Sequence, residues 1–196
     1  MIALPNYADI NGRPMKKLQI QQYLRKLQLN DFEPAVNLAT LTKLQDAHLK
    51  YIPYENFDSL NGKITSLKRQ DMFNKVIMHN RGGICFELNG LYNWLLESLG
   101  FEVTSYAARF IDKMETYQLR RHRVMCVALG EKRYLTDVGV NSESPRVPLE
   151  ITEGLIQSDG ISQYKFTRSE FWGWLLWQKE RGKIWKRLFG FTEEPQ

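Results

Sequence analysis

A cysteine lies in a short segment whose composition suits nucleophilic chemistry. The segment reads Arg81-Gly82-Gly83-Ile84-Cys85-Phe86-Glu87. Apolar residues then recur at helical spacing as far as Leu99, which predicts a helix that begins at Cys85 and ends near Gly100. The first turn of a helix has unpaired N–H groups and the positive end of the helix dipole, so it favours a thiolate over a thiol. We interpret Cys85 as a candidate nucleophile, preceded by glycines that permit close backbone approach and positive φ.

A buried structural role is the alternative for this cysteine. Free cysteines are among the most buried residue types, and a thiol that follows a loop can simply pack in a core. The two interpretations are balanced on this segment alone. The decision depends on whether a base and a carboxylate occur elsewhere in the chain.

His122 and Asp137 stand near the outer ends of two segments that read as a β-hairpin. His122 opens the alternating apolar run 122–129, and the turn-forming residues 130–133 separate it from the returning run 134–139. Antiparallel pairing would bring the imidazole and the carboxylate together. A cysteine nucleophile needs a base within hydrogen-bond reach, and the base needs a carboxylate that fixes its tautomer. The sequence therefore predicts a triad of Cys85, His122 and Asp137.

The remaining pattern places helices in the first half of the chain and strands in the second. Helical spacing of apolar residues occurs around residues 20–27, 38–47 and 66–77, with Ser66 as a candidate cap for the third helix. Short strands are expected at residues 101–110, 122–129, 134–138, 163–167, 171–178 and 184–191. The expected fold class is α+β, an N-terminal helical bundle followed by an antiparallel β-barrel or sheet, with a Cys-His-Asp core like that of cysteine proteases. We expect a helical domain over residues 1–100 and a β domain over residues 101–196.

The chain resembles the arylamine N-acetyltransferases. Besides Arg81-Gly82-Gly83-Ile84-Cys85-Phe86-Glu87, the resemblance rests on His122 at the opening of a strand, on Tyr134-Leu135-Thr136-Asp137-Val138-Gly139 and on Ile52-Pro53-Tyr54-Glu55-Asn56-Phe57. These four matches occur in order and cover essentially the whole chain. They imply that Cys85, His122 and Asp137 are catalytic. They also imply that Glu55 and Arg81 pair beneath the site and support Gly82 and Gly83; two unrelated surface charges are the alternative.

Two features depart from that family. Its members usually continue well beyond the point that corresponds to Gln196, so the resemblance predicts that the usual C-terminal α/β lid domain, which helps to enclose coenzyme A and the acceptor, is absent. The family also shows Val-Gly-Phe-Gly after the aspartate, whereas this chain has Val138-Gly139-Val140-Asn141. The resemblance assigns these four residues and Phe86 to the substrate cleft. Residues that bind coenzyme A are not identified.

The resemblance implies an acetyl-CoA-dependent, two-step acyl transfer. The cysteine would take the acetyl group as a thioester and pass it to a small arylamine or hydrazine, with acetyl-CoA as co-substrate and no tightly bound cofactor. Two other interpretations stay open. A thiol hydrolase or transglutaminase-like enzyme uses the same order of Cys, His and Asp. A catalytically weak or silent short relative would act as a binding protein, and bare apolar surface would then favour homo-oligomers.

Composition narrows the remaining choices. The chain has 196 residues, 43% of them hydrophobic, and a formal net charge of +5, as in a folded globular protein with a basic surface. The basic stretch 179–187 is interpreted as a solvated hairpin turn, so neither nucleic acid nor membrane is expected as a partner. The two cysteines and three histidines lack zinc-site spacing. With no signal-like N-terminus and no disulfide framework, the expected location is the cytoplasm.

Overall fold

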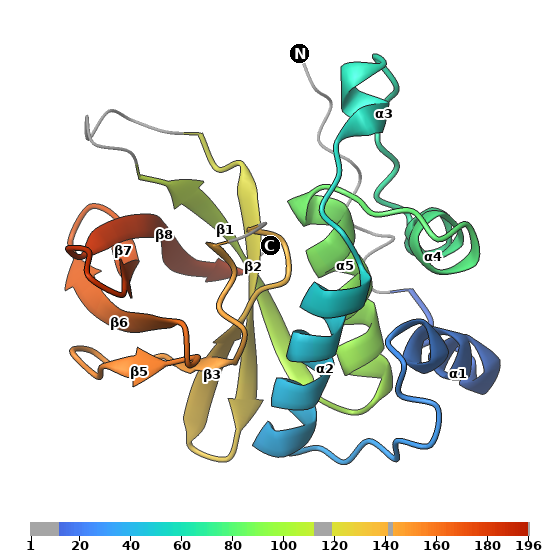
Figure 1. The fold of residues 1–196 in the computed structure, drawn as a ribbon, viewed down its shortest axis with the longest axis horizontal. Helices are drawn as coiled ribbons and strands as arrows, with labels where there is room; N and C mark the ends of the chain where they lie inside the picture. The colour runs from blue at the N-terminus through green and yellow to red at the C-terminus, as the bar shows by residue number, and fades with distance from the viewer. Residues whose placement is uncertain (1–11, 112–118, 141–142, 196) are drawn as a thin grey trace.

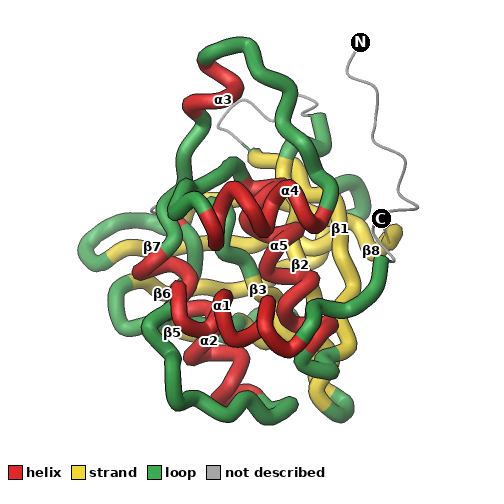
Figure 2. The backbone as a smooth tube through the Cα atoms, turned by 90° about the vertical axis from the view of Figure 1, so that its right-hand side faces the viewer, coloured by secondary structure: helices red, strands yellow, loops and turns green. Residues whose placement is uncertain are grey.

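The computed structural model describes residues 12–111, 119–140 and 143–195, in which helices pack on one side of a curved sheet (Figure 1). The helices are α1 (Lys17–Lys26), α2 (Leu38–Tyr51), α3 (Phe57–Leu60), α4 (Arg69–Phe73), the π-helix η2 (Asn74–Met78) and α5 (Cys85–Ser98). The strands are β1 (Glu102–Phe110), β2 (His122–Leu129), β3 (Lys132–Thr136), β4 (Leu149–Glu150), β5 (Gln157–Ser158), β6 (Ser162–Ser169), β7 (Gly173–Glu180) and β8 (Lys186–Pro195). Figure 2 looks at the molecule from the helical side, with the strands behind the helices. The expected α+β class, with helices before strands, is confirmed.

The sheet is antiparallel and curls into a nearly closed barrel. Its strand order is β4-β3-β2-β1-β8-β7-β6-β5, so β4 and β5 are the two outer strands. The side chain of Gln157 joins them, because its oxygen accepts the N–H of Glu150 at 2.7 Å and its amide donates to the carbonyl of Glu150 at 2.9 Å. One side chain thus satisfies backbone groups that an open sheet edge would leave unpaired.

The β2–β3 hairpin sets the register near the predicted site. Leu129 pairs with Lys132, so Gly130 and Glu131 form a two-residue loop, and Gly130 has the positive φ of 62° that a type II′ turn requires at that position. The strand β3 therefore starts two residues earlier than the sequence pattern suggested. The register pairs Met125 with Thr136, which leaves Asp137 immediately beyond β3, at the end where β2 begins.

Strand β2 is buried on both faces, and this explains its apolar composition. Met125 and Val127 pack into a core shared with the helices, whereas Val124 and Cys126 pack into the core inside the barrel, as the alternation of side chains along a strand requires. Burial raises the pKa of Cys126 to about 11. Its thiol is therefore a packing group.

Helix α5 is the central helix of the structure. It packs against both β1 and β2, and its leucines Leu88, Leu91 and Leu95 are fully buried. The helix begins at Cys85 as predicted and ends shortly before Gly100, whose positive φ of 93° suits a helix terminus. None of the described helices combines the length and apolar character needed to cross a bilayer.

Several elements differ from the sequence-based expectations. Ser66 does not cap the third helix; it donates to the carboxylate of Asp71 at 2.6 Å, and α4 begins at Arg69. The continuation of that helix adopts the π geometry of η2. The short elements α3, β4 and β5 were not anticipated, since two to four residues carry too little periodicity to predict an element.

His48 of α2 is a fully buried histidine within the helical core. Its ring lies beside Tyr23 and Tyr92, with centroid separations of 6.0 and 5.3 Å. Neither ring nitrogen has a hydrogen-bond partner among the residues described. Burial lowers the pKa of His48 to about 3, so the residue is a neutral packing group near pH 7.

Acidification should destabilise the fold through His48. The pKa of His48 in the folded protein is about 3, below the ordinary value for histidine. Between these two pKa values, His48 takes up a proton in the unfolded chain but not in the folded protein. The free energy of unfolding is therefore highest above about pH 6.5 and decreases as the pH falls. This amounts to about 2 kcal/mol between pH 7 and pH 5. Urea titrations at both pH values measure the free energy of unfolding. Its decrease from pH 7 to pH 5 should be smaller in His48→Leu than in the parent by about 2 kcal/mol. The exposed His79 supplies the control, His79→Gln; equal losses in His48→Leu and the parent would contradict the prediction.

Candidate active site

Cys85 is the first residue of α5 and is only 8% exposed. Its thiol donates to the carbonyl oxygen of Arg121, just before β2, at 3.6 Å. The backbone N–H groups of Cys85 and Phe86 donate no hydrogen bond to any described residue. The nucleophile candidate therefore lies where the start of α5 meets the start of β2, beside two unpaired donors.

His122 and Asp137 form a buried pair next to this helix start. The imidazole Nε2 and the carboxylate Oδ2 are 2.6 Å apart, and neither side chain is exposed to solvent. The second carboxylate oxygen accepts the side-chain amide of Asn89 and the N–H of Gly139, each at 2.8 Å. Both oxygens of Asp137 are therefore occupied, and the carboxylate has a fixed orientation.

The electrostatics of His122 follow from this pairing. Burial lowers its pKa, but the charge and hydrogen bond of Asp137, together with the Cys85 thiol, outweigh burial and raise the pKa to about 9. The rings of Phe110 and Phe189 flank the imidazole, with centroids at 5.0 and 5.2 Å. Because Nε2 is directed to the carboxylate, Nδ1, which has no hydrogen-bond partner among the described residues, is the nitrogen available to exchange a proton with the thiol.

Asn89 positions this pair and was not singled out from the sequence. Its amide nitrogen donates to Asp137 and to the carbonyl of Arg123, at 2.8 and 2.5 Å, while its oxygen accepts the N–H of Val138 at 2.9 Å. Asn89 follows Cys85 by one helical turn, so both project from one face of α5. Its spacing from Cys85 does not mark it in the sequence, because the same helix also carries the polar residues Glu87 and Asn93.

Three glycines allow backbone to approach closely around the cysteine. A Cβ on Gly139 would lie 2.8 Å from the Cα of Cys85, and a Cβ on Gly82 would lie 2.0 Å from the carbonyl oxygen of Pro53. A Cβ on Gly83 would meet the Glu87 carboxylate at 2.9 Å. The expectation of positive φ at Gly82 and Gly83 was wrong, since neither is among the glycines with positive φ. Close approach alone accounts for their lack of a side chain.

Glu55 and Arg81 form an ion pair. The Arg81 Nη2 and Nε atoms donate to Glu55 Oε1 at 2.7 and 3.1 Å. The pair extends to Asp58 of α3, which lies 3.1 Å from Arg81. Arg81 is 38% exposed and Glu55 only 9%, so the pair is half-buried, and its supporting role beneath the site stays a prediction. Sequence analysis did not identify Asp58 as a member of this cluster.

The residues assigned to a substrate cleft occupy different surroundings. Val138 packs in the core shared with the helices, and Val140 packs in the barrel core. Phe86 is half-buried, and Gly139 contacts Cys85. Asn141 lies outside the described residues. Their role in substrate binding stays a prediction, with the backbone at Gly139 closest to the cysteine.

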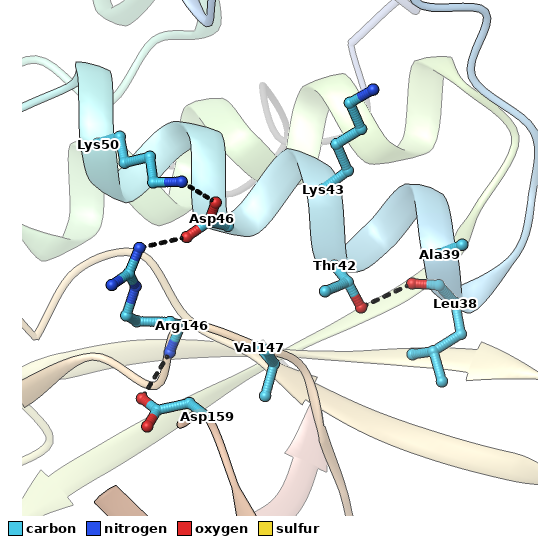
Figure 3. A pocket seen from close by; sticks show the side chains of 9 residues that line it. All are labelled: Leu38, Ala39, Thr42, Lys43, Asp46, Lys50, Arg146, Val147 and Asp159. Carbon is cyan, nitrogen blue, oxygen red and sulfur yellow. Dashed lines mark hydrogen bonds and ion pairs between the residues drawn. The ribbon is translucent and has the colours of Figure 1, made fainter. Parts of the chain in front are cut away.

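An open groove occurs elsewhere, between α2 and residues that lie just before β4 and just after β5 (Figure 3). Asp46 is one of its lining residues and accepts hydrogen bonds from Lys50 at 2.5 Å and Arg146 at 2.8 Å. None of the predicted site residues lines this groove. Across the described ranges, no group of three or more His, Cys, Asp or Glu side chains could hold a metal ion.

Comparisons with known proteins place the chain in a family. A family model described as N-acetyltransferase matches residues 37–196. The arylamine N-acetyltransferase of Mycolicibacterium smegmatis is 35% identical over 180 residues, covering 89% of this chain and 64% of that protein. The solved arylamine N-acetyltransferase of Salmonella typhimurium has a TM-score of 0.86 at 26% identity, covering 93% of this chain and 65% of that one. That of Mycobacterium marinum in complex with CoA has a TM-score of 0.82 at 27% identity, covering 90% and 66%.

The chain belongs to the arylamine N-acetyltransferase family, which confirms the resemblance inferred from the sequence motifs. It spans less than two thirds of the length of each of these three relatives.

Replacing Gly139 should destabilise the protein by overpacking. In Gly139→Ala the new methyl group would lie 2.8 Å from the backbone of Cys85, which cannot move without shifting α5, so we expect a loss of about 1–3 kcal/mol. Urea-induced unfolding measures this loss. Gly90→Ala is the matched control, because the methyl group there meets only the flexible ends of Met72 and Arg123, at 3.2–3.3 Å. Equal stability of Gly139→Ala and the parent would show that the contact is not tight.

The titration of His122 should depend on Asp137. An NMR titration of the imidazole should give a midpoint near 9 in the parent. In Asp137→Asn the midpoint should fall by more than about 2 units, because burial remains while the compensating carboxylate charge is lost. Asp46→Asn, which changes a paired aspartate in the groove of Figure 3, should leave it unchanged. A midpoint that stays near 9 in Asp137→Asn would refute the assignment of Asp137 as the dominant partner.

Proposed function

We propose that the protein transfers an acetyl group from acetyl-CoA, through a thioester on Cys85, to an arylamine or a hydrazine. The observation that carries the proposal is the position of Cys85, at the start of a helix and beside the buried pair of His122 and Asp137, in a member of this family. The first step needs a nucleophile, a proton acceptor and donors for the developing oxyanion. This part of the molecule supplies all three.

In the first step the Cys85 sulfur attacks the thioester carbonyl of acetyl-CoA. The proton of the thiol goes to His122, whose raised pKa of about 9 favours the imidazolium near pH 7. Asp137 stabilises that cation. The unpaired N–H groups of Cys85 and Phe86 are suited to donate hydrogen bonds to the carbonyl oxygen as negative charge develops on it. Collapse of the tetrahedral intermediate breaks the bond to the coenzyme sulfur, which leaves with the proton from the imidazolium.

In the second step the acceptor amine attacks the acetyl-cysteine. The neutral imidazole takes a proton from the attacking nitrogen, and the same N–H groups stabilise the oxyanion. Cleavage of the carbon–sulfur bond then releases the amide and returns the thiolate. The ring of Phe110 beside His122 is 41% exposed and offers apolar surface at this point, which suits an aromatic acceptor.

The surrounding residues are assigned supporting roles in the same proposal. Glu55 and Arg81 would hold the segment that contains Gly82 and Gly83, and Asn89 would hold Asp137. The relative from Mycobacterium marinum, solved in complex with CoA, supports acetyl-CoA as the co-substrate. Phe86, Gly139 and the adjoining backbone are the proposed wall of the acceptor cleft.

Incubation with acetyl-CoA in the absence of an acceptor tests the first step. Intact mass spectrometry with peptide mapping should find one acetyl group on Cys85, because the thioester accumulates when no amine can discharge it. Adding an aromatic amine or hydrazine should remove the label and yield one equivalent of amide. Cys85→Ala should give neither signal.

The second cysteine provides the matched control for this experiment. Cys126→Ala removes a buried thiol from the barrel core and should still acetylate Cys85. Steady release of acetate without an acceptor would favour the hydrolase interpretation. An unmodified Cys85 in folded protein would refute acetyl transfer by this chain and leave the binding interpretation.

A further inference from the structure

Lys75 of the π-helix η2 lies at the centre of a group of three carboxylates. Its Nζ atom is 2.8 Å from Glu87 Oε1, 2.9 Å from Asp58 Oδ2 and 3.6 Å from Glu55 Oε1. The side chain is only 16% exposed. Burial lowers the pKa of Lys75, but hydrogen bonds to Glu87 and Asp58, with the charges of Glu87 and Glu55, outweigh it and raise the pKa, so the residue is a cation. A single ammonium group thus bridges η2, α3 and α5.

Lys75 contacts both ends of the segment that carries Cys85. Its carbonyl oxygen accepts the backbone N–H of Arg81 at 3.1 Å, and its ammonium donates to both oxygens of Glu87, at 2.8 and 3.1 Å. The π geometry of η2 widens the helical turn that carries Lys75, and single π turns often occur at functional sites. Lys75 therefore contacts the start of the segment 81–87 through its main chain and the end of that segment through its side chain.

Glu87 connects this lysine to the start of α5. Its Oε2 atom accepts the N–H of Ile84, the residue just before Cys85, at 2.9 Å. This bond satisfies one of the unpaired donors at the helix start and leaves the N–H groups of Cys85 and Phe86 available. The Glu87 side chain is only 3% exposed, so its negative charge lies near the cysteine with little screening by water.

That charge acts against a thiolate on Cys85 unless a cation compensates it. Both charges act on one neighbour, since burial and the charges of Cys85 and Glu87 raise the pKa of Tyr54. The carboxylate itself accepts the N–H of Ile84, the residue just before Cys85. On the sheet side, the charge of Cys85 also acts on His122, which is paired with Asp137. Among the described residues, Lys75 is the cation that lies against the Glu87 carboxylate.

We propose that Lys75 is a positioning residue that holds the Glu87 carboxylate on the first turn of α5 and neutralises its charge, so that Cys85 can react as a thiolate. The proposal rests on the proposed function only in taking Cys85 as the nucleophile. Lys75 does not touch the reacting atoms. It acts through Glu87, and its effect depends on the negative charge of that residue.

Alkylation of Cys85 by iodoacetamide across pH 5–9 tests the proposal without acetyl-CoA. In Lys75→Met the rate at pH 7 should fall about three- to tenfold and the profile should move to higher pH, since an uncompensated like charge disfavours the thiolate. Lys75→Arg, which keeps the cation, should stay within about twofold of the parent. Lys75→Met combined with Glu87→Gln should recover the parent profile, because no charge then needs compensation.

Lys50→Met is the matched control, since it removes a lysine of α2 that pairs with Asp46 in the groove of Figure 3, which no predicted site residue lines. Its profile should match that of the parent. An unshifted profile in folded Lys75→Met would overturn the proposal, as would failure of the double variant to recover. If Lys75→Met does not fold, the double variant and Lys75→Arg still decide. Failure of acetyl transfer would appear differently, as a parent protein whose Cys85 is alkylated by iodoacetamide but never acetylated.

Discussion

The pair of His122 and Asp137 imposes the strictest constraint on this structure, because an imidazole and a carboxylate are held 2.6 Å apart with no exposure to water. Burying two ionisable groups costs free energy unless each polar atom is satisfied. The carboxylate meets that requirement with donors from Asn89 on α5 and from the backbone at Gly139. The helix and the sheet must therefore dock in one relative position.

The rest of the fold keeps that position rigid. The strand β2 is buried on one face by the helices and on the other by the barrel interior, so its register cannot slip without exposing apolar side chains. Gly139 sets the distance between its own segment and α5, because the backbone of Cys85 lies where a side chain at position 139 would project. Cys85 and His122 thus lie on two separate elements, α5 and β2, which share one core.

A second electrostatic system lies beside the segment that precedes Cys85. Glu55, Asp58 and Glu87 share the cations Lys75 and Arg81, and this cluster ties α3 and η2 to the segment before α5. In the proposed mechanism, one system would supply a proton acceptor to the thiol, and the other would compensate a carboxylate beside the helix start. The sheet side would then govern proton transfer, whereas the helical side would govern how well the helix start tolerates a thiolate.

The sequence by itself determined the elements whose patterns are local. The start of α5 at Cys85 follows from the glycines before it and the leucines after it, and the β2–β3 hairpin follows from alternation around Gly130. These features predicted that His122 and Asp137 would lie close together. Motif spacing also identified the family and the candidate triad.

Only the tertiary structure decided which residues hold the triad in place. Asn89 and Lys75 look like ordinary polar positions on helices, and nothing in their local patterns connects them to Asp137 or Glu87. Gln157 and Glu150 close the barrel through contacts between its two outer strands. Helical and strand periodicity are set by neighbours a few residues apart, whereas these contacts exist only after segments distant in sequence have packed. The sequence therefore identified the candidate reacting groups, and packing determined which groups contact them and carry the compensating charges.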